Sequence, residues 1–283
     1  MVSKKLSIII ATYNVASSIE KCLDSILSQT FQDYEVIIVD GASRDETADI
    51  IAHYRDTRIK FISEPDNGIY DAWNKGISLS NGEWLAFIGA DDCYSSSSSL
   101  QLLIDSIPVS DDAPIIYGKI HSEGPAGDIT GEGGEPWFDV FSLKFNYLKC
   151  RLPIPVMSAI YSRNFIKNEK FDLALKVTAD ADLLLRCLRR WKGNPPYFIA
   201  SDKPIVRMGY GGISTNRKTY IITLKNSLKT RRKNGISNIN LAMMVRVIKV
   251  YMILAVGRFL GDSFLVSSLA KYHLMKKKVR RVN

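Results

Sequence analysis

Short apolar runs alternate with longer segments whose apolar residues recur every three or four positions through the first ninety or so residues of the chain. Continuous apolar runs of this length are typical of buried strands, and the spaced segments are typical of amphipathic helices. The runs that predict strands are residues 6–11, 35–40, 59–63 and 84–88. The segments that predict helices are residues 19–27, 46–54 and 69–80. Strands that alternate with helices in this way predict βαβ units and a mostly parallel central sheet, so the expected fold class is α/β.

The pattern becomes less regular after residue 95. Further strands are predicted at residues 115–118 and 156–161, and further helices at 100–107 and 180–191. The segment from Glu123 to Pro136 is rich in glycine, proline and acidic residues, so we predict a long surface loop there. The segment from Met208 to Thr215 contains three glycines and predicts a second loop.

Charge divides the chain near residue 216. The net charge of +9 is not evenly distributed, because residues 1–216 hold fewer basic than acidic side chains. Residues 217–283, in contrast, are strongly basic and contain only one acid, Asp262. We therefore predict an α/β domain at residues 1–216 and a basic helical C-terminal region at residues 217–283, which an anionic partner would bind.

The C-terminal region is apolar as well as basic. Charged residues interrupt the apolar segment 241–266, and its longest uncharged apolar run lies at residues 250–257. A spanning helix needs about 20 apolar residues, so we expect residues 241–283 to lie on an anionic inner-leaflet membrane surface instead. One alternative is a helical cap with a solvated basic end. Nucleic acid is the other possible anionic partner, but we do not expect it, because the aromatic residues lie in apolar surroundings.

The cysteines and histidines indicate neither a zinc site nor a disulfide framework, because no CxxC pair and no regular histidine spacing occurs. Unpaired cysteines favour a reducing compartment. The first apolar run is too short for a signal peptide. We therefore expect a cytoplasmic protein that is peripheral on the inner face of the membrane, and the sequence does not indicate its oligomeric state. The cysteines are Cys22, Cys93, Cys150 and Cys187.

Polar residues follow three of the predicted strands. The segment Thr12–Asn14 follows the first strand, Asp40 closes the second, and Asp91 and Asp92 follow the fourth. The carboxyl ends of parallel strands share one edge of a sheet, so we expect these groups to converge on one crevice. No glycine-rich phosphate-binding motif is present, so a diphosphate here would need a cation, and paired carboxylates offer it oxygen ligands. An Asp-rich turn is the alternative interpretation.

Four stretches resemble, in order and in spacing, the signatures of the inverting GT-A glycosyltransferases of family two. The resemblance covers about residues 5–215 and is strongest over 5–95. The third stretch is most similar to a branch associated with bacterial surface polysaccharides, including O-antigen and capsule. The four stretches are Ile10-Ala-Thr-Tyr-Asn14, Val39-Asp-Gly-Ala-Ser-Arg-Asp45, Glu64-Pro-Asp-Asn-Gly-Ile-Tyr-Asp-Ala-Trp-Asn-Lys-Gly76 and Gly89-Ala-Asp-Asp92.

The resemblance implies a Rossmann-like GT-A fold and the transfer of a single sugar. The implied donor is a nucleotide-diphosphate sugar, with a UDP-sugar preferred, and the implied acceptor is a hydroxyl of a polyprenyl-linked saccharide. Asp92, with Asp91, would hold Mn²⁺ or Mg²⁺, and Asp45 would lie at the edge of the site or serve a turn. The residues implied to bind the nucleotide sugar are Thr12, Tyr13, Asn14, Asp40, Asp66, Asn67, Asn74, Lys75 and Asp91.

The sequence departs from the family pattern at the segment of the general base. Members of the family carry Glu-Asp at the start of a helix, and Asp180 aligns with their base, whereas Ala179 replaces the Glu. Asp182 is the second candidate, and a helix N-cap is a further possible role for Asp180. The departure at Ala179 leaves open a catalytically inactive protein that binds a nucleotide sugar or acts as a scaffold.

Overall fold

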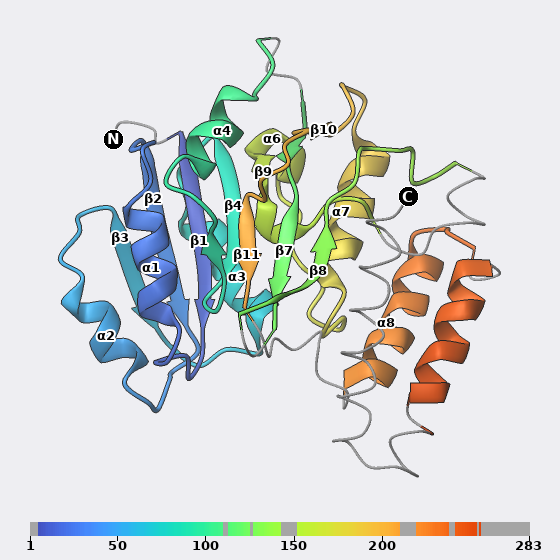
Figure 1. Cartoon of the computed structure of the whole chain (residues 1–283), viewed down its shortest axis with the longest axis horizontal. Helices are drawn as coiled ribbons and strands as arrows, with labels where there is room; N and C mark the ends of the chain where they lie inside the picture. The colour runs from blue at the N-terminus through green and yellow to red at the C-terminus, as the bar shows by residue number, and fades with distance from the viewer. Residues whose placement is uncertain are drawn as a thin grey trace.

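The computed structural model describes residues 5–109, 113–124, 127–142, 152–209, 219–237, 241–253 and 255. A seven-stranded sheet in the order β10-β6-β9-β4-β1-β2-β3 forms its centre (Figure 1). All neighbouring strands of this sheet run parallel except β9, which runs antiparallel to both β4 and β6. The strands are β1 (Leu6–Thr12), β2 (Tyr34–Asp40), β3 (Ile59–Ser63), β4 (Trp84–Gly89), β6 (Ile115–Tyr117), β9 (Ala159–Ser162) and β10 (Tyr197–Phe198).

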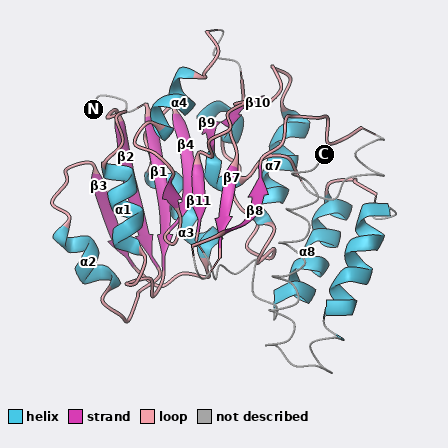
Figure 2. Ribbon diagram, viewed as in Figure 1, coloured by secondary structure: helices cyan, strands magenta, loops and turns pink. Residues whose placement is uncertain are grey.

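Helices cover both faces of this sheet because side chains alternate between the faces along each strand. In β1, Ile8 and Ile10 pack in a cluster with α1, α2 and α4, while Ile9 packs in a second cluster with α3, α6 and α7. The mixed α/β arrangement is visible in Figure 2, and the predicted fold class is confirmed. The helices are α1 (Ile19–Leu27), α2 (Thr47–His53), α3 (Ile69–Leu79), α4 (Ser99–Asp105), α6 (Arg163–Ile166) and α7 (Ala179–Arg190).

A second sheet, which the apolar pattern did not predict, has the strand order β5-β11-β7-β8. The prediction of one long loop from Glu123 to Pro136 was wrong, because β8 pairs with β7 as an antiparallel hairpin. Both strands are short, and none of their residues is fully buried, so their side chains leave little apolar alternation to detect. Likewise, the predicted loop at Met208 begins inside a strand, although residues 210–218 lie outside the described residues. The strands are β5 (Cys93–Tyr94), β7 (Ile120–Glu123), β8 (Ile129–Gly133) and β11 (Val206–Met208).

The segment predicted as a strand at residues 156–161 has two parts. Residues Val156–Ser158 form the short 3₁₀ turn η1, and β9 begins only at Ala159. Because β9 runs antiparallel to β4, with Ala86 opposite Ile160, η1 lies near the carboxyl end of β4. Residues that precede β9 therefore reach the edge of the sheet at which β1, β2 and β4 end.

Helix α8 (Tyr220–Lys233) lies beside α7, and residues 241–253 form a further helix beside α8 (Figure 1). A left-handed residue ends α8, since Gly235 has φ +62°, a conformation that glycine adopts without a steric penalty. The Ile236 and Gly235 N–H groups then donate to the carbonyls of Arg231 (2.8 Å) and Arg232 (3.1 Å), the two bonds of a Schellman motif.

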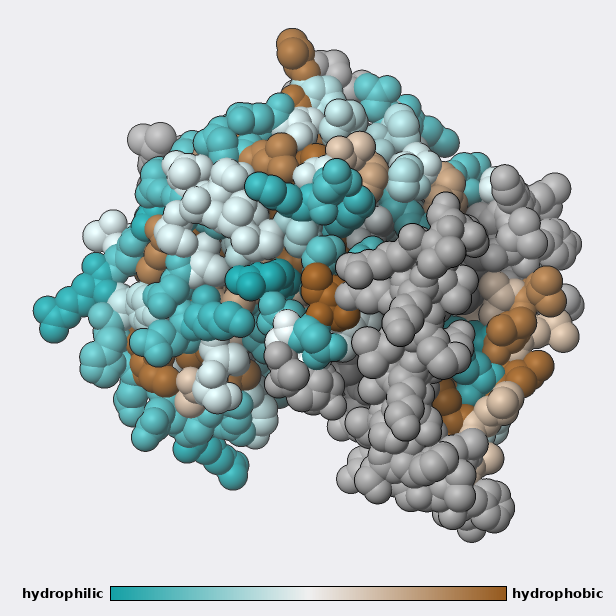
Figure 3. Space-filling view, viewed as in Figure 1, coloured by the Kyte–Doolittle hydropathy of each residue, from teal (hydrophilic) through white to brown (hydrophobic). Residues whose placement is uncertain are grey.

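The helix at residues 241–253 presents apolar side chains to solvent. Its exposed residues recur at helical spacing and are 56 to 64% accessible, whereas Met243 on the opposite face is buried. Hydrophobic side chains are visible along the right-hand margin of the molecule in Figure 3, over the position of this helix. Within the described residues, no helix has the length and apolar character needed to cross a membrane. The exposed apolar residues are Leu241, Met244, Val245, Ile248, Tyr251 and Met252.

Candidate active site

Asp40 lies at the end of β2, and its carboxylate is fully buried. Its Oδ1 accepts hydrogen bonds from Thr12 Oγ1 (2.9 Å) and Ser43 Oγ (2.5 Å). Its Oδ2 accepts hydrogen bonds from Ser43 N (2.9 Å) and Ser63 Oγ (2.7 Å). Burial alone would raise the pKa of Asp40, but these hydrogen bonds stabilise the carboxylate and lower its pKa below the ordinary value. The ends of β1, β2 and β3 are thus joined through one ionised side chain.

The segment after β1 forms the rim above Asp40. Asn14 has φ +51°, and its backbone N–H donates to Ser43 Oγ (2.9 Å) while its Oδ1 accepts from Arg44 N (2.8 Å). Tyr13 is 58% exposed, which leaves its ring available to a ligand. Asp45 accepts from Ala16 N (3.1 Å) and from Thr47 Oγ1 (2.5 Å), so its carboxylate holds the turn before α2.

Asp66 lies close to the same place. A Cβ built at Gly41, the residue after Asp40, would lie only 2.8 Å from Asp66 Oδ2, so the backbone there approaches this carboxylate closely. Asp66 also accepts from Gly68 N (2.7 Å) at the start of α3. Its neighbour Asn67 donates to Asp71 Oδ2 (3.0 Å) on the first turn of that helix.

Asn74 and Lys75 hold neighbouring segments in position. Asn74 is buried, and its amide exchanges two hydrogen bonds with the backbone of Phe171, from Phe171 N (2.8 Å) and to Phe171 O (3.0 Å). Lys75 donates to Pro65 O (3.0 Å) and pairs with Glu64 (2.7 Å). Asn74 therefore fixes the segment that leads into α7, and a direct contact of either residue with a nucleotide stays a prediction.

Asp91 and Asp92 follow β4, which neighbours β1 in parallel with Ala11 opposite Gly89. Both carboxylates converge over Gly89, where a Cβ would lie 2.8 Å from Asp92 Oδ2 and 2.9 Å from Asp91 Oδ1. Asp92 is buried, and its Oδ1 accepts from Gly209 N (3.0 Å) in the segment after β11. Burial and the adjacent charge of Asp91 raise the pKa of Asp92 to about 7.

These two carboxylates fit a divalent cation that a substrate phosphate also binds. The described residues contain no group of three or more His, Cys, Asp or Glu side chains able to hold a metal ion. Mg²⁺ in phosphate-transfer sites characteristically has only one or two carboxylate ligands, with phosphate oxygens and water as the others. The carboxylates of Asp91 and Asp92 converge, and burial beside Asp91 destabilises the ionised form of Asp92. The pair therefore matches that donor set.

Asp180 lies in the first turn of α7, after the N-cap residue Thr178, so Asp180 is not itself the N-cap. Its Oδ1 accepts a hydrogen bond from the hydroxyl of Tyr70 on α3 (3.0 Å). Burial raises the pKa of Asp180 above its ordinary value, although the Tyr70 hydroxyl acts in the opposite direction. Asp180 is also one of the residues that line a pocket of about 230 Å³. An ionisable group with a raised pKa beside a pocket has the properties of a general base.

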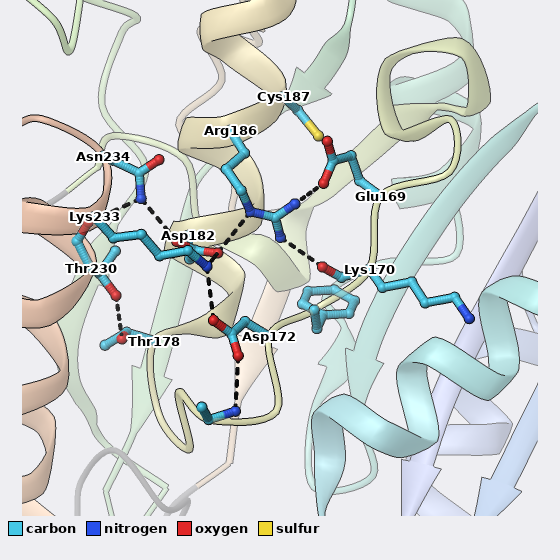
Figure 4. A network of polar contacts seen from close by, with 12 residues as sticks. Glu169, Lys170, Asp172, Thr178, Asp182, Arg186, Cys187, Thr230, Lys233 and Asn234 are labelled. Atoms are coloured by element: carbon cyan, nitrogen blue, oxygen red, sulfur yellow. Dashed lines mark hydrogen bonds and ion pairs between the residues drawn. The ribbon is translucent and has the colours of Figure 1, made fainter.

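Asp182 has a different environment, because its side chain is 0% exposed and faces α8 (Figure 4). Its Oδ2 accepts from Arg186 Nε (2.8 Å) and Lys233 Nζ (3.0 Å), and its Oδ1 accepts from Asn234 Nδ2 (2.9 Å). Two positive charges and an amide thus surround the carboxylate. This arrangement joins α7 to the end of α8 and favours Asp180 over Asp182 as the group that meets substrate.

Several groups at this site were not predicted from the sequence. Ser43 and Ser63 complete the ring around Asp40, Tyr70 positions Asp180, and the backbone of Gly209 binds Asp92. The Ser43 hydroxyl lies within one of the quoted motifs, and its position after Asp40 could have indicated its role. Gly209 carries no such signal, because its contribution is a backbone N–H from the segment after β11, 117 residues along the chain.

Comparison with protein families matches residues 7–160 to the model described as glycosyl transferase family 2. A "PGL/p-HBAD biosynthesis glycosyltransferase" of Mycobacterium bovis is 34% identical over 191 residues, which cover 66% of this chain and 71% of that protein. The "uncharacterized glycosyltransferase EpsJ" of Bacillus subtilis is 39% identical over 102 residues, or 35% of this chain and 29% of that protein.

Solved structures show a similar fold. S. aureus TarS residues 1–349, in complex with UDP-GlcNAc, superposes with a TM-score of 0.59 at 21% identity, covering 78% of this chain and 65% of that chain. The mannosyltransferase PcManGT from Pyrobaculum calidifontis, in complex with GDP-Man and Mn²⁺, superposes with a TM-score of 0.62 at 16% identity. That superposition covers 97% of this chain and 81% of PcManGT.

Proposed function

Because the chain belongs to glycosyl transferase family 2, we propose that it moves one sugar from a nucleotide-diphosphate sugar to an acceptor hydroxyl with inversion at the anomeric carbon. One observation carries the proposal: the carboxylates of Asp91 and Asp92 converge at the sheet edge where Thr12 and Asp40 also lie. In an open α/β sheet this edge is where ligands bind.

The donor nucleotide would occupy the crevice at the ends of β1, β2 and β4. Tyr13 offers an exposed ring at its rim. Asp40 already accepts four hydrogen bonds, which fill the acceptor positions of a carboxylate. A base could therefore contact Asp40 only after a hydroxyl such as that of Ser43 turns away, or else contact the hydroxyls themselves. UDP is the preferred nucleotide, as in the TarS complexes, and the GDP-Man complex of PcManGT shows the main alternative.

Asp91 and Asp92 would hold Mn²⁺ or Mg²⁺, whose positive charge would stabilise the departing nucleoside diphosphate. The protein contributes a fixed pair of carboxylates to that site. The Gly209 N–H orients Asp92, and the absence of a side chain at Gly89 leaves room for both carboxyl groups.

Asp180 would take the proton of the acceptor hydroxyl while that oxygen attacks the anomeric carbon and the diphosphate departs from the other side. A single displacement of this kind inverts the anomeric centre and forms no covalent enzyme intermediate. Tyr70 holds the carboxylate in place through its hydroxyl, which must be a donor to an ionised acid. The surrounding burial makes Asp180 a stronger base than an exposed aspartate, because its pKa is raised.

The acceptor that we propose is a lipid-linked saccharide used in bacterial surface polysaccharide synthesis, at the cytoplasmic face of the membrane. The apolar face of residues 241–253 supports this location, because an exposed apolar helix face is suited to the membrane interface. Basic residues of the region 217–283 add attraction of about 1 kcal/mol for each Lys or Arg that lies near an anionic surface.

Nucleotide binding by the purified full-length chain tests the donor half of the proposal. UDP at 100 times its dissociation constant stabilises a native protein by about 2.7 kcal/mol. That free energy corresponds to a rise in Tm of roughly 5–10 °C for a chain of this size. We expect this rise with Mn²⁺ and UDP together, and its loss in Asp92→Asn. Asp105→Asn, on the exposed part of α4, is the matched control.

Hydrolysis of the nucleotide sugar separates an enzyme from a catalytically inactive binding protein. We expect slow metal-dependent release of UDP from a UDP-sugar in the absence of acceptor, and its loss in Asp92→Ala. Binding of the UDP-sugar without any release or transfer would show that the chain only binds the nucleotide sugar. Binding of neither UDP nor GDP in the presence of Mn²⁺ would overturn the proposal.

A further inference from the structure

Two side chains on one face of α3 contact the segment that leads from α6 into α7. Asn74 lies one helical turn after Tyr70, so the two project from the same side of the helix. Asn74 bonds to the backbone of Phe171, and Tyr70 bonds to the carboxylate of Asp180. Helix α3 therefore holds this segment at two points, one of them in the first turn of α7.

The Asn74 amide satisfies both polar groups of the Phe171 backbone. It accepts from Phe171 N (2.8 Å) and donates to Phe171 O (3.0 Å). Phe171 is buried and lies outside the helices and strands, so regular secondary structure does not pair its backbone. A buried N–H or C=O without a partner is unfavourable, so the amide determines where Phe171 lies.

The ring of Phe171 lies among other aromatic rings. It stacks on Tyr70 with the ring centroids 5.4 Å apart and an interplanar angle of 26°. Its centroid also lies 5.3 Å from the ring centroids of both Trp73 and Phe87. Closely packed rings cannot shift independently, so displacement of the Phe171 backbone would also displace the ring of Tyr70.

The position of the Tyr70 ring decides how well its hydroxyl meets Asp180. The hydroxyl donates to Asp180 Oδ1 over 3.0 Å, and such a bond weakens steeply as its geometry departs from linear. Phe171 and Asp180 also line a common cavity of about 10 Å³. That volume is no more than a single water needs, so the packing there leaves no room for solvent to replace a displaced Tyr70 hydroxyl.

We propose that Asn74 is a positioning residue for the base, in place of the nucleotide contact that the family resemblance implies. Asn74 fixes Phe171 against Tyr70, and the Tyr70 hydroxyl in turn stays on the carboxylate of Asp180. This inference rests on the proposed function, because it takes Asp180 as the base. It assigns Asn74 to the deprotonation of the acceptor, so a change at Asn74 should slow the reaction and leave the affinity for UDP unchanged.

Two variants of Asn74 and one matched control test the proposal. Asn74→Leu removes both hydrogen bonds and keeps the branching of the side chain, and Asn74→Ala removes them without the added bulk of leucine. Gln29→Met is the control, because Gln29 is also a buried amide that joins distant backbone segments. It donates to Ser25 O (2.9 Å) and Ser96 O (2.8 Å) and accepts from Leu100 N (2.9 Å). These contacts join α1 to α4 on the other face of the central sheet, so all three variants should lose stability but only those at Asn74 should affect the base.

NMR of the full-length chain, labelled with ¹³C at the tyrosine ζ carbon, measures the contact of Tyr70 with Asp180 without turnover. The signal of Tyr70 is the one that disappears in Tyr70→Phe. Asp180→Asn replaces the ionised acceptor with a weaker neutral one, and its Tyr70 shift is the reference for a weakened bond. We expect both Asn74 variants to move the Tyr70 signal toward that reference, whereas Gln29→Met leaves it in place. An unmoved signal in both Asn74 variants would overturn the proposal.

Release of UDP from UDP-GlcNAc in the presence of Mn²⁺, with water in place of the acceptor, measures the effect on the reaction. We expect Asn74→Leu to lower kcat at least tenfold, with a Kd for UDP within twofold of wild type. Adding Asn74→Leu to Tyr70→Phe should lower kcat less than threefold further, because both changes disturb the same contact. Additive losses in the double variant would overturn the proposal. Tenfold weaker UDP binding at wild-type kcat would also overturn it, since Asn74 would then be a nucleotide contact.

The two proposals can fail separately. Wild-type protein that does not bind nucleotide with Mn²⁺, or an Asp180→Asn variant that releases UDP at the wild-type rate, would refute the proposed function. Slow release by Asp180→Asn, together with wild-type rates and an unmoved Tyr70 signal in both Asn74 variants, would refute only the positioning role of Asn74.

Discussion

Replacing Asp182 with alanine should destabilise the protein far more than it impairs catalysis. The wild-type side chain is fully buried and accepts hydrogen bonds from Arg186, Lys233 and Asn234. Removal of one partner from a buried ion pair typically costs about 3–5 kcal/mol, because the remaining charge loses its compensation.

The structure places the cost near the lower end of that range. Lys233 keeps a second partner in Asp172 (2.8 Å), and Arg186 keeps the carbonyl of Lys170 (2.6 Å) and the carboxylate of Glu169. The Asn234 amide also loses its acceptor on α7, but that amide still reaches the carbonyl of Thr230 (3.0 Å). We therefore expect a loss of about 3 kcal/mol in the free energy of unfolding. For a chain of this size the expected fall in Tm is roughly 6–12 °C.

Differential scanning calorimetry and steady-state kinetics of the same variants measure the two effects. Asp172→Asn is the control, because Asp172 is a partly exposed partner of the same lysine and should cost only about 0–1 kcal/mol. Assays of Asp182→Ala well below its Tm should give a kcat within about tenfold of wild type. An Asp182→Asn protein with wild-type Tm and a kcat reduced by more than a hundredfold would refute the reasoning and identify Asp182 as the base.

Four further outcomes follow from the site. Asp180→Asn should lower kcat about 10²–10⁴-fold at unchanged nucleotide affinity, and in the wild type kcat/KM should rise with pH through the raised pKa of Asp180, since the base must be ionised. Tyr70→Phe removes a donor to the ionised carboxylate, so the pKa of Asp180 should rise further and the acid limb of the pH–rate profile should move to higher pH. Gly89→Ala should push apart the Asp91 and Asp92 carboxylates, which isothermal titration should detect as weaker Mn²⁺-dependent binding of UDP without loss of the native circular dichroism spectrum. Ile248→Asp should reduce flotation with anionic liposomes, whereas the same change at the exposed Leu102 of α4, Leu102→Asp, should leave flotation unchanged, and equal flotation of the two would contradict the proposed membrane role of residues 241–253.

Strands β1, β2 and β4 were predictable from the sequence because they are buried on both faces and carry apolar runs, whereas the edge strand β3 holds only partly buried and exposed residues. The predicted bounds of these four strands differ from the observed ones by at most one residue. Helix α1 was predicted at its observed bounds, since one face of it packs against β1 and the other is polar. The family resemblance rested largely on polar residues at the ends of these strands. These residues both end the apolar runs and form the candidate site.

The second sheet and the wall of the pocket could not be predicted, because neither depends on local pattern. Strand β7 is defined by its pairing with β11, more than eighty residues later, and its own residues are only partly buried. Only Arg186 among the partners of Asp182 lies in the same segment, four residues along α7, whereas Lys233 and Asn234 lie 51 and 52 residues away and have no local signal. Asp180 and Asp182 look alike in the sequence, and their side chains differ in environment only because of the tertiary contacts that each makes.

That difference shows how α7 serves both the chemistry and the scaffold. Two residues along a helix correspond to a rotation of about 200°, so Asp180 and Asp182 face different neighbours. Asp180 meets a single hydroxyl donor and the pocket, whereas Asp182 meets two cations and an amide from its own helix and from α8. Carboxylates in such contrasting environments are suited to different tasks, the first to accept a proton and the second to hold structure. Since the contacts of Asp182 fix α8 beside Asp180, α8 would be a structural part of the proposed acceptor site, although its residues belong to the region that the charge pattern separates from the α/β domain.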